Sequence, residues 1–183
     1  MKNINWNNVQ EASDYKTLPV GAYIAVIVAA EDVPEKEYLN LYWDVAEGEF
    51  KDHFREMTRS MKERGKLDTG KWAWGGIVKK SYKETALPYF KAFLTAVEQS
   101  NPGYKFANDE KTLRGKLVGV VLGEEEYAAN DGSVKTKLVV NRFTSVSKIR
   151  EGDFEIPPKK LLNGSSASAA YSAPVSDNDD LPF

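Results

Sequence analysis

An alternating stretch from Tyr38 to Ala46 restricts the fold more than any other part of the chain. Apolar side chains recur there at every second position, at Leu39, Leu41, Trp43 and Val45. The residues between them are aromatic or polar, at Tyr38, Asn40, Tyr42 and Asp44. A period of two is that of a β-strand with one buried face. The alternation therefore predicts a half-buried strand that places Trp43 in the core and Tyr42 on an aromatic, polar outer face.

Four further strands are expected around this one. Ala22 to Ala30 is almost wholly apolar, which favours a buried strand, and His53 to Met61 is expected to form the third strand. Lys116 to Leu122, with a continuation to Tyr127 left open, and Val134 to Ile149 are the expected fourth and fifth strands. Asn130-Asp131-Gly132 between them is a strong hairpin turn signal.

One helix is expected between the third and fourth strands, from Ala86 to Gln99. Its apolar residues fall at helical spacing, and Asn101-Pro102-Gly103 ends it. Five strands in the order β-β-β-α-β-β match the oligonucleotide/oligosaccharide-binding fold (OB-fold). We therefore predict a mainly β chain with a five-stranded OB-fold barrel, one helix between strands three and four, and a disordered C-terminal tail.

Basic charge is concentrated in one region, although the whole chain has a formal net charge of −2. Met61 to Lys83 holds seven basic and two acidic residues, a net of +5, together with Trp72, Trp74 and Tyr82. Binding of single strands without sequence preference needs such cations beside aromatic platforms on which bases stack. The expected nucleic-acid contacts are Tyr42, Arg55, Arg59, Lys62, Arg64, Lys66, Lys71, Trp72, Trp74, Lys79, Lys80, Tyr82, Lys83, Lys135 and Lys137.

Some of these candidates have a more specific basis. Arg55 and Arg59 alternate on the expected third strand, so their guanidinium groups would share a face. Lys135 and Lys137 share one face of the last strand and are secondary candidates. Trp72 and Trp74 are each left open between stacking on bases and packing against the barrel.

The chain changes character at Asn163. Residues 163–176 are small and polar, which predicts a flexible linker. Residues 177–183 read Asp-Asn-Asp-Asp-Leu-Pro-Phe, which offers one ring for a pocket, a terminal carboxylate for a cation and acids for a basic rim. The predicted organisation is an OB-fold nucleic-acid-binding domain at 1–162, the linker at 163–176 and an acidic partner-binding tip at 177–183.

This terminus resembles that of the bacterial single-stranded DNA-binding proteins, which end in an acidic run, an apolar residue, Pro and Phe after a disordered linker. In that family the tip recruits enzymes of DNA replication, recombination and repair. The resemblance implies a partner-binding role for Asp177, Asp179, Asp180, Leu181, Pro182 and Phe183. The chain departs from the family in having Asn178 among the acids and Leu181 where Ile is usual.

The body of the chain resembles a different group, the phage-encoded OB-fold single-strand binders. The resemblance rests on Val20-Gly21-Ala22-Tyr23 before the apolar strand and on Tyr38 to Glu47 followed by Gly48. The long insert from Met61 to Tyr82 departs from the cellular form, so the cellular tetramer is not carried over. Whether several copies of the chain assemble is left open.

Several chemistries are excluded by composition and spacing. The chain has no Cys and one His, which removes thiolate chemistry and histidine-rich metal sites. Gly65 to Lys71 has phosphate-loop spacing, but Trp72 stands where Ser or Thr must bind magnesium. Alternation would split Glu124, Glu125 and Glu126 between two faces. We therefore expect no catalytic site, no enzyme activity, no metal and no cofactor.

These observations predict a non-catalytic protein that binds and protects single-stranded DNA without sequence preference. It would recruit replication, recombination and repair proteins, of a host or a phage, through its tip. The alternatives are a protein-interaction adaptor with the OB-fold as scaffold, and a DNA-processing enzyme. A polar start and no apolar run of about 20 residues predict no secretory signal and no membrane contact. The expected location is the cytoplasm, that of the bacterial host if the chain is phage-encoded.

Overall fold

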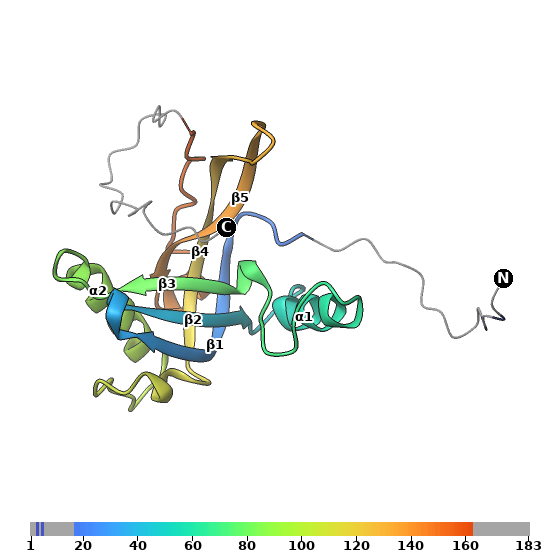
Figure 1. The fold of residues 1–183 in the computed structure, drawn as a ribbon. Helices are drawn as coiled ribbons and strands as arrows, with labels where there is room; N and C mark the ends of the chain where they lie inside the picture. The colour runs from blue at the N-terminus through green and yellow to red at the C-terminus, as the bar shows by residue number, and fades with distance from the viewer. Residues whose placement is uncertain (1–2, 4, 6–16, 163–183) are drawn as a thin grey trace.

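The fold is a single five-stranded antiparallel sheet with helices between its strands (Figure 1). The computed structural model describes residues 3, 5 and 17–162, so the predicted linker and tip lie outside the described residues. The strand order is β3-β2-β1-β4-β5. The strands are β1 (Ala22–Val33), β2 (Tyr38–Val45), β3 (Ile77–Ser81), β4 (Leu117–Ala128) and β5 (Val134–Thr144). No ladder joins β3 to β5 among the described residues, so the sheet is open and the mainly β prediction is confirmed without the barrel.

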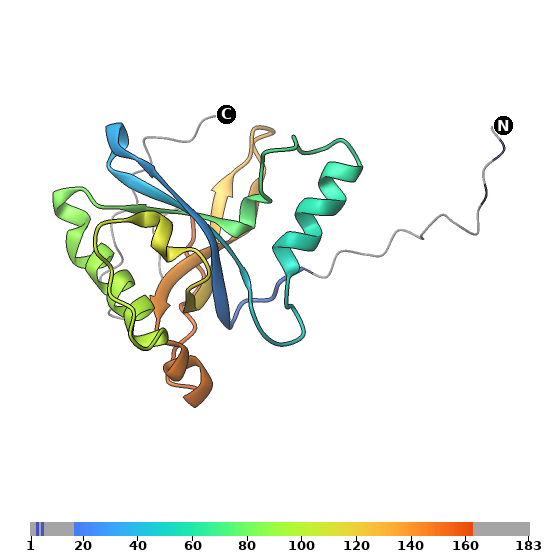
Figure 2. The ribbon, with the colours of Figure 1, turned by 90° about the horizontal axis from the view of Figure 1, so that it is seen from below.

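Within the described residues, three α-helices accompany the sheet, and two of them lie at opposite ends of it (Figures 1 and 2). They are α1 (His53–Glu63), α2 (Leu87–Ser100) and α3 (Val146–Glu151). Short 3-10 turns are η2 (Pro34–Lys36), η3 (Trp74–Gly76), η4 (Glu84–Ala86) and η5 (Glu110–Leu113). The predicted helix from Ala86 to Gln99 is confirmed as α2. In the described part of the chain, no helix is long and apolar enough to cross a membrane.

The prediction of a strand from His53 to Met61 is wrong, because this segment forms α1. Its inward side chains, Phe54, Met57, Thr58 and Met61, are spaced by three and four residues, which is a helical period. The third strand is β3 instead, which lies within the basic region from Met61 to Lys83. The expected last strand ends at Thr144, and α3 begins after Ser145, whose Oγ accepts a hydrogen bond from the Lys148 N–H.

The core lies on one face of the sheet, under α2. Leu39, Leu41, Trp43 and Val45 of β2 are buried as the alternation predicts, with Trp43 only 1% exposed. Phe90, Phe93 and Val97 of α2 belong to the same apolar cluster. Asp44 departs from the pattern, since it belongs to the predicted outer face and yet is fully buried.

Residues 153–162, here called the strap, run from α3 back along β4. The Lys160 N–H donates to the Glu124 carbonyl and the Glu126 N–H donates to the Lys160 carbonyl, at 2.9 Å each. Lys159 and Lys160 form ion pairs with Glu126 and Glu125, at 2.8 and 3.1 Å. The strap thus occupies the edge of β4 that β1 leaves unpaired beyond Leu122.

Candidate nucleic-acid interface

The outer face of β2 and β3 combines aromatic and basic side chains. The register places Tyr38 opposite Ser81, Asn40 opposite Lys79 and Tyr42 opposite Ile77. Directly opposed residues share a face, and these three pairs lie on the face opposite the core. The Nζ atom of Lys79 lies 5.0 Å from the centre of the Tyr38 ring, within cation–π range. This face therefore offers two aromatic rings and a cation.

Tyr42 is fixed on this face by β1. Its hydroxyl donates a 2.7 Å hydrogen bond to Oε2 of Glu31. Partial burial and then this hydrogen bond raise the pKa of Tyr42 to about 12. The phenol is therefore neutral at physiological pH, and Glu31 holds its ring in one orientation.

Trp74 is the most exposed large hydrophobic residue of the described chain, with 78% of its surface accessible. Its neighbours are nevertheless anchored. Ala73 is fully buried, and its N–H donates a 2.9 Å hydrogen bond to Oγ1 of Thr58 on α1. Trp72 is partly buried and packs against the core cluster, so the two tryptophans have different surroundings.

Two glycines complete this anchor. A Cβ on Gly75 would lie 2.7 Å from Cε1 of Phe54, and one on Gly76 would lie 2.9 Å from Cγ of Phe54 and collide with the Trp72 indole nitrogen. Backbone and rings therefore pack too closely here for any larger residue. The indole nitrogen of Trp72 is buried without a hydrogen-bond partner among the described residues. This packing favours a structural role for Trp72, whereas the ring of Trp74 remains exposed to solvent.

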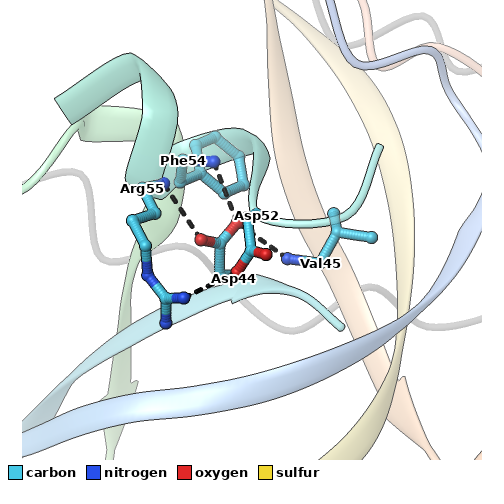
Figure 3. A network of polar contacts seen from close by, with 5 residues as sticks. All are labelled: Asp44, Val45, Asp52, Phe54 and Arg55. Carbon is cyan, nitrogen blue, oxygen red and sulfur yellow. Dashed lines mark hydrogen bonds and ion pairs between the residues drawn. The ribbon is translucent and has the colours of Figure 1, made fainter. Parts of the chain in front are cut away.

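Helix α1 is attached to the sheet by the buried carboxylate of Asp44 (Figure 3). Oδ1 accepts hydrogen bonds from the N–H groups of Val45 and Phe54, at 2.9 and 2.8 Å. Oδ2 accepts one from the N–H of Arg55 at 2.9 Å. Helix N-termini leave such N–H groups without partners inside the helix, and a carboxylate satisfies them. Burial raises the pKa of Asp44, and the three hydrogen bonds oppose that rise.

Sequence reasoning missed Asp44 because a strand residue caps a helix that begins nine positions later. The residue next to the helix, Asp52, makes no side-chain cap and has a left-handed backbone, with φ of 60°. Its carboxylate pairs instead with the Arg55 guanidinium at 2.8 Å. The only local signal is an acid at an otherwise apolar end of a strand.

Three predicted basic residues form a row on α1. Arg55, Arg59 and Lys62 are spaced by four and three residues, so they follow one side of the helix. The prediction that Arg55 and Arg59 share a face therefore holds, although on a helix rather than on a strand. Lys66 and Lys71 are exposed in the connection to η3, where Lys71 pairs with Asp68 at 2.8 Å, and Arg64 directly follows the helix.

Lys80 and Tyr82 lie away from the outer face. Lys80 opposes Leu39, and its Nζ lies 5.5 Å from the Phe143 ring centre, so burial lowers its pKa. The Tyr82 hydroxyl donates to Oδ1 of Asp32 at 2.8 Å, which contributes most to raising its pKa to about 12. Lys80 and Tyr82 therefore lie on the core side of the sheet. Lys83 is exposed at the turn into η4. The alternation of β3 could have separated Lys79 from Lys80.

The hairpin of β4 and β5 carries the secondary candidates. Lys135 opposes Tyr127 in the ladder, and its Nζ lies 3.4 Å from Oδ2 of Asp131. Lys137 opposes Glu125, and its Nζ lies 3.9 Å from Oε2 of Glu125 and 5.6 Å from the centre of the Tyr127 ring. Acidic neighbours therefore offset much of this positive charge. The hairpin projects beyond the rest of the sheet in Figure 1.

No group of three or more His, Cys, Asp or Glu in residues 3, 5 and 17–162 could hold a metal ion. No protein-family model matches the chain, and no curated protein matches its sequence. The evidence for a function therefore comes from this chain's own residues.

Proposed function

We propose that the protein binds single-stranded DNA without sequence preference, with the strand lying on the outer face of β2 and β3. The observation that carries the proposal is Trp74, an indole 78% exposed to solvent on a segment that is anchored to α1 and the core. A large exposed ring on an anchored backbone is prepared to stack on a base at little entropic cost. Such stacking tolerates every base.

We further propose that the sheet is an OB-fold. β1 pairs with both β2 and β4, β2 pairs with β3, and α2 lies between β3 and β4 in the chain. Lys80 of β3 and Phe143 of β5 approach each other across the opening. This arrangement is compatible with a partly open barrel of the OB type. In OB-folds the face of strands two and three binds oligonucleotides, which is the face that carries Tyr38, Tyr42 and Lys79 here.

Recruitment of replication, recombination and repair proteins through Asp177 to Phe183 is the second part of the proposal. Its support is the residue pattern of the tip. Binding to the strand and binding to partners would then use separate parts of one chain.

Titration of the protein with oligo-dT, followed by tryptophan fluorescence, tests the DNA-binding function. We expect quenching, with an affinity that falls steeply as salt is raised. Trp74→Ala should weaken binding by about 1–3 kcal/mol and remove most of the quenching. Tyr89→Ala is the matched control, because Tyr89 is an exposed ring on α2.

The same titration can reject the proposal. Absence of binding at low salt would leave the adaptor function. Cleavage of the oligonucleotide on addition of magnesium would establish a DNA-processing enzyme instead. Unchanged affinity in a folded Trp74→Ala variant would remove Trp74 from the interface.

A further inference from the structure

The basic row on α1 lies beside Thr58, the residue that holds the segment carrying Trp74. Thr58 follows Arg55 by three residues and precedes Lys62 by four, so its side chain lies beside both on the helix surface. The Thr58 hydroxyl accepts the hydrogen bond from Ala73, the residue before Trp74. The row and the exposed indole therefore border the same contact between α1 and the 72–76 segment.

The other end of this segment leads onto the sheet. Ile77 follows Trp74 by three residues and opposes Tyr42 in the β2–β3 ladder. The segment that carries Trp74 thus contacts α1 at Ala73 and leads onto the outer face of β2 and β3 at Ile77. From Arg55 to Lys62 the row extends about 10 Å along the helix axis.

We infer that a bound single strand leaves the sheet at Trp74 and continues along α1, where Arg59 and Lys62 contact its phosphates and Arg55 borders the path. This inference rests on the proposed function and adds a second, sequence-independent contact region to it. The row offers cations without an exposed aromatic ring, so it suits the backbone of the strand rather than its bases. The sheet and Trp74 would hold bases, and α1 would hold phosphates.

The two regions predict different responses to strand length. An OB-fold covers about 4–16 nucleotides, so an oligo-dT of about 6 nucleotides should occupy the sheet face and one of about 20 should also reach α1. A double variant, Arg59→Gln with Lys62→Gln, leaves the Arg55–Asp52 pair and the Asp44 cap intact. On the long oligonucleotide its salt slope should be smaller by about 1.4, since each lost phosphate contact on a single strand removes about 0.7. On the short oligonucleotide the slope should stay unchanged.

Lys91→Gln with Lys111→Gln is the control, because it removes the same charge from exposed positions on α2 and η5, away from α1 (Figures 1 and 2). A thermal melt establishes that both double variants are folded, and Arg59→Lys with Lys62→Arg should restore the wild-type slope. If the salt slope decreased equally on both oligonucleotide lengths, or decreased in the control variant, the row would contribute only general electrostatic attraction, and the inference would be overturned. An unchanged salt slope of the Arg59/Lys62 double variant on both lengths would also overturn the inference. In that case, weaker binding by Trp74→Ala would still support the proposed function. Failure of the wild-type protein to bind either length would reject both.

Discussion

At the scale of single residues, Asp44 shows how one side chain determines where a helix is placed. Its carboxylate is fully buried and accepts three backbone hydrogen bonds, two of them from the first turn of α1. Hydrogen bonds to a charged group contribute about 1.5–3 kcal/mol each, and a buried N–H without a partner costs about 1–3 kcal/mol. The attachment of α1 therefore depends on this residue as well as on apolar contacts such as that between Phe54 and Trp43.

Replacing Asp44 with Ala should lower the free energy of unfolding by about 3 kcal/mol, because the N–H groups of Phe54 and Arg55 lose their acceptor. Asp44→Asn should cost less, since one side-chain oxygen can still accept. Urea denaturation followed by circular dichroism measures both. Equal stability of the Ala variant and the wild type would show that α1 does not need the carboxylate.

Two phenols give an expected pH dependence. The pKa values of Tyr42 and Tyr82 are each raised to about 12 in the folded protein, against an ordinary value of 10.0. A raised folded-state pKa means that the neutral phenol stabilises the fold below pH 10, and that this contribution is lost as the pH rises from about 10 to 12. Burial also raises the pKa of Tyr23. An ultraviolet titration should therefore find Tyr42 and Tyr82 among the phenols that ionise late. Replacing both residues with Phe should lower the amplitude of the late transition by two phenols, and an unchanged amplitude would contradict the assignment.

At the scale of elements, the segment from Trp72 to Gly76 joins α1 to β3 and is held by close packing rather than by regular structure. A Cβ at Gly76 would press on Phe54 and Trp72. This crowding holds the backbone on the C-terminal side of Trp74 against Phe54 and Trp72.

Gly76→Ala should therefore destabilise the protein by about 1–3 kcal/mol through overpacking and should also weaken oligo-dT binding, because Trp74 moves with the segment. Gly70→Ala is the matched control, since a Cβ there meets no atom within 4 Å. Thermal unfolding and the fluorescence titration measure the two effects. A Gly76→Ala variant as stable as the control would show that the packing can relax without cost.

The elements that the sequence predicted are those whose pattern is local. The alternation of β2 and the apolar spacing of α2 identify a strand and a helix, and both are confirmed. The segment of α1 carries the pattern of a strand as well as that of a helix, because Arg55, Met57 and Arg59 alternate in polarity. The acid that caps α1 lies on β2, and this pairing can be recognised only in the tertiary structure. β3 has only five residues, two of them Lys, so its short alternation does not stand out from the basic region around it.

Some features of the candidate interface could likewise be predicted from the sequence, and others depend on the fold. The cluster of basic and aromatic residues was visible in the sequence, and so were the alternating faces of β2. The orientation of Trp72 and Trp74 was not, because it depends on Phe54, Thr58 and two glycines that come together only in the fold. The placement of Lys80 against Phe143 likewise depends on a strand far along the chain.

At the scale of the whole molecule, the described residues end with the strap at Leu162, and the predicted linker and tip lie outside them. Removing Asp177 to Phe183 should leave the melting temperature nearly unchanged. Affinity for oligo-dT should stay the same or rise slightly at low salt, where the acids of the tip are least screened from the basic surface. Binding to replication or recombination enzymes should be lost, and Phe183→Ala alone should remove most of it. Full partner binding by the truncated chain would contradict the role of the tip.

The strap has a consequence for self-association. Beyond Leu122, β4 would otherwise show a row of unpaired N–H and carbonyl groups on the side opposite β5, and such a bare edge can template the strand of another molecule. Lys160 fills these positions, and Pro157 lies over Gly123, where a Cβ would come within 2.8 Å of the proline ring. Proline and lysine are residues with which natural sheets block such edges. A chain ending at Gly152 should therefore form aggregates that grow with protein concentration, whereas one ending at Leu162 should remain monodisperse.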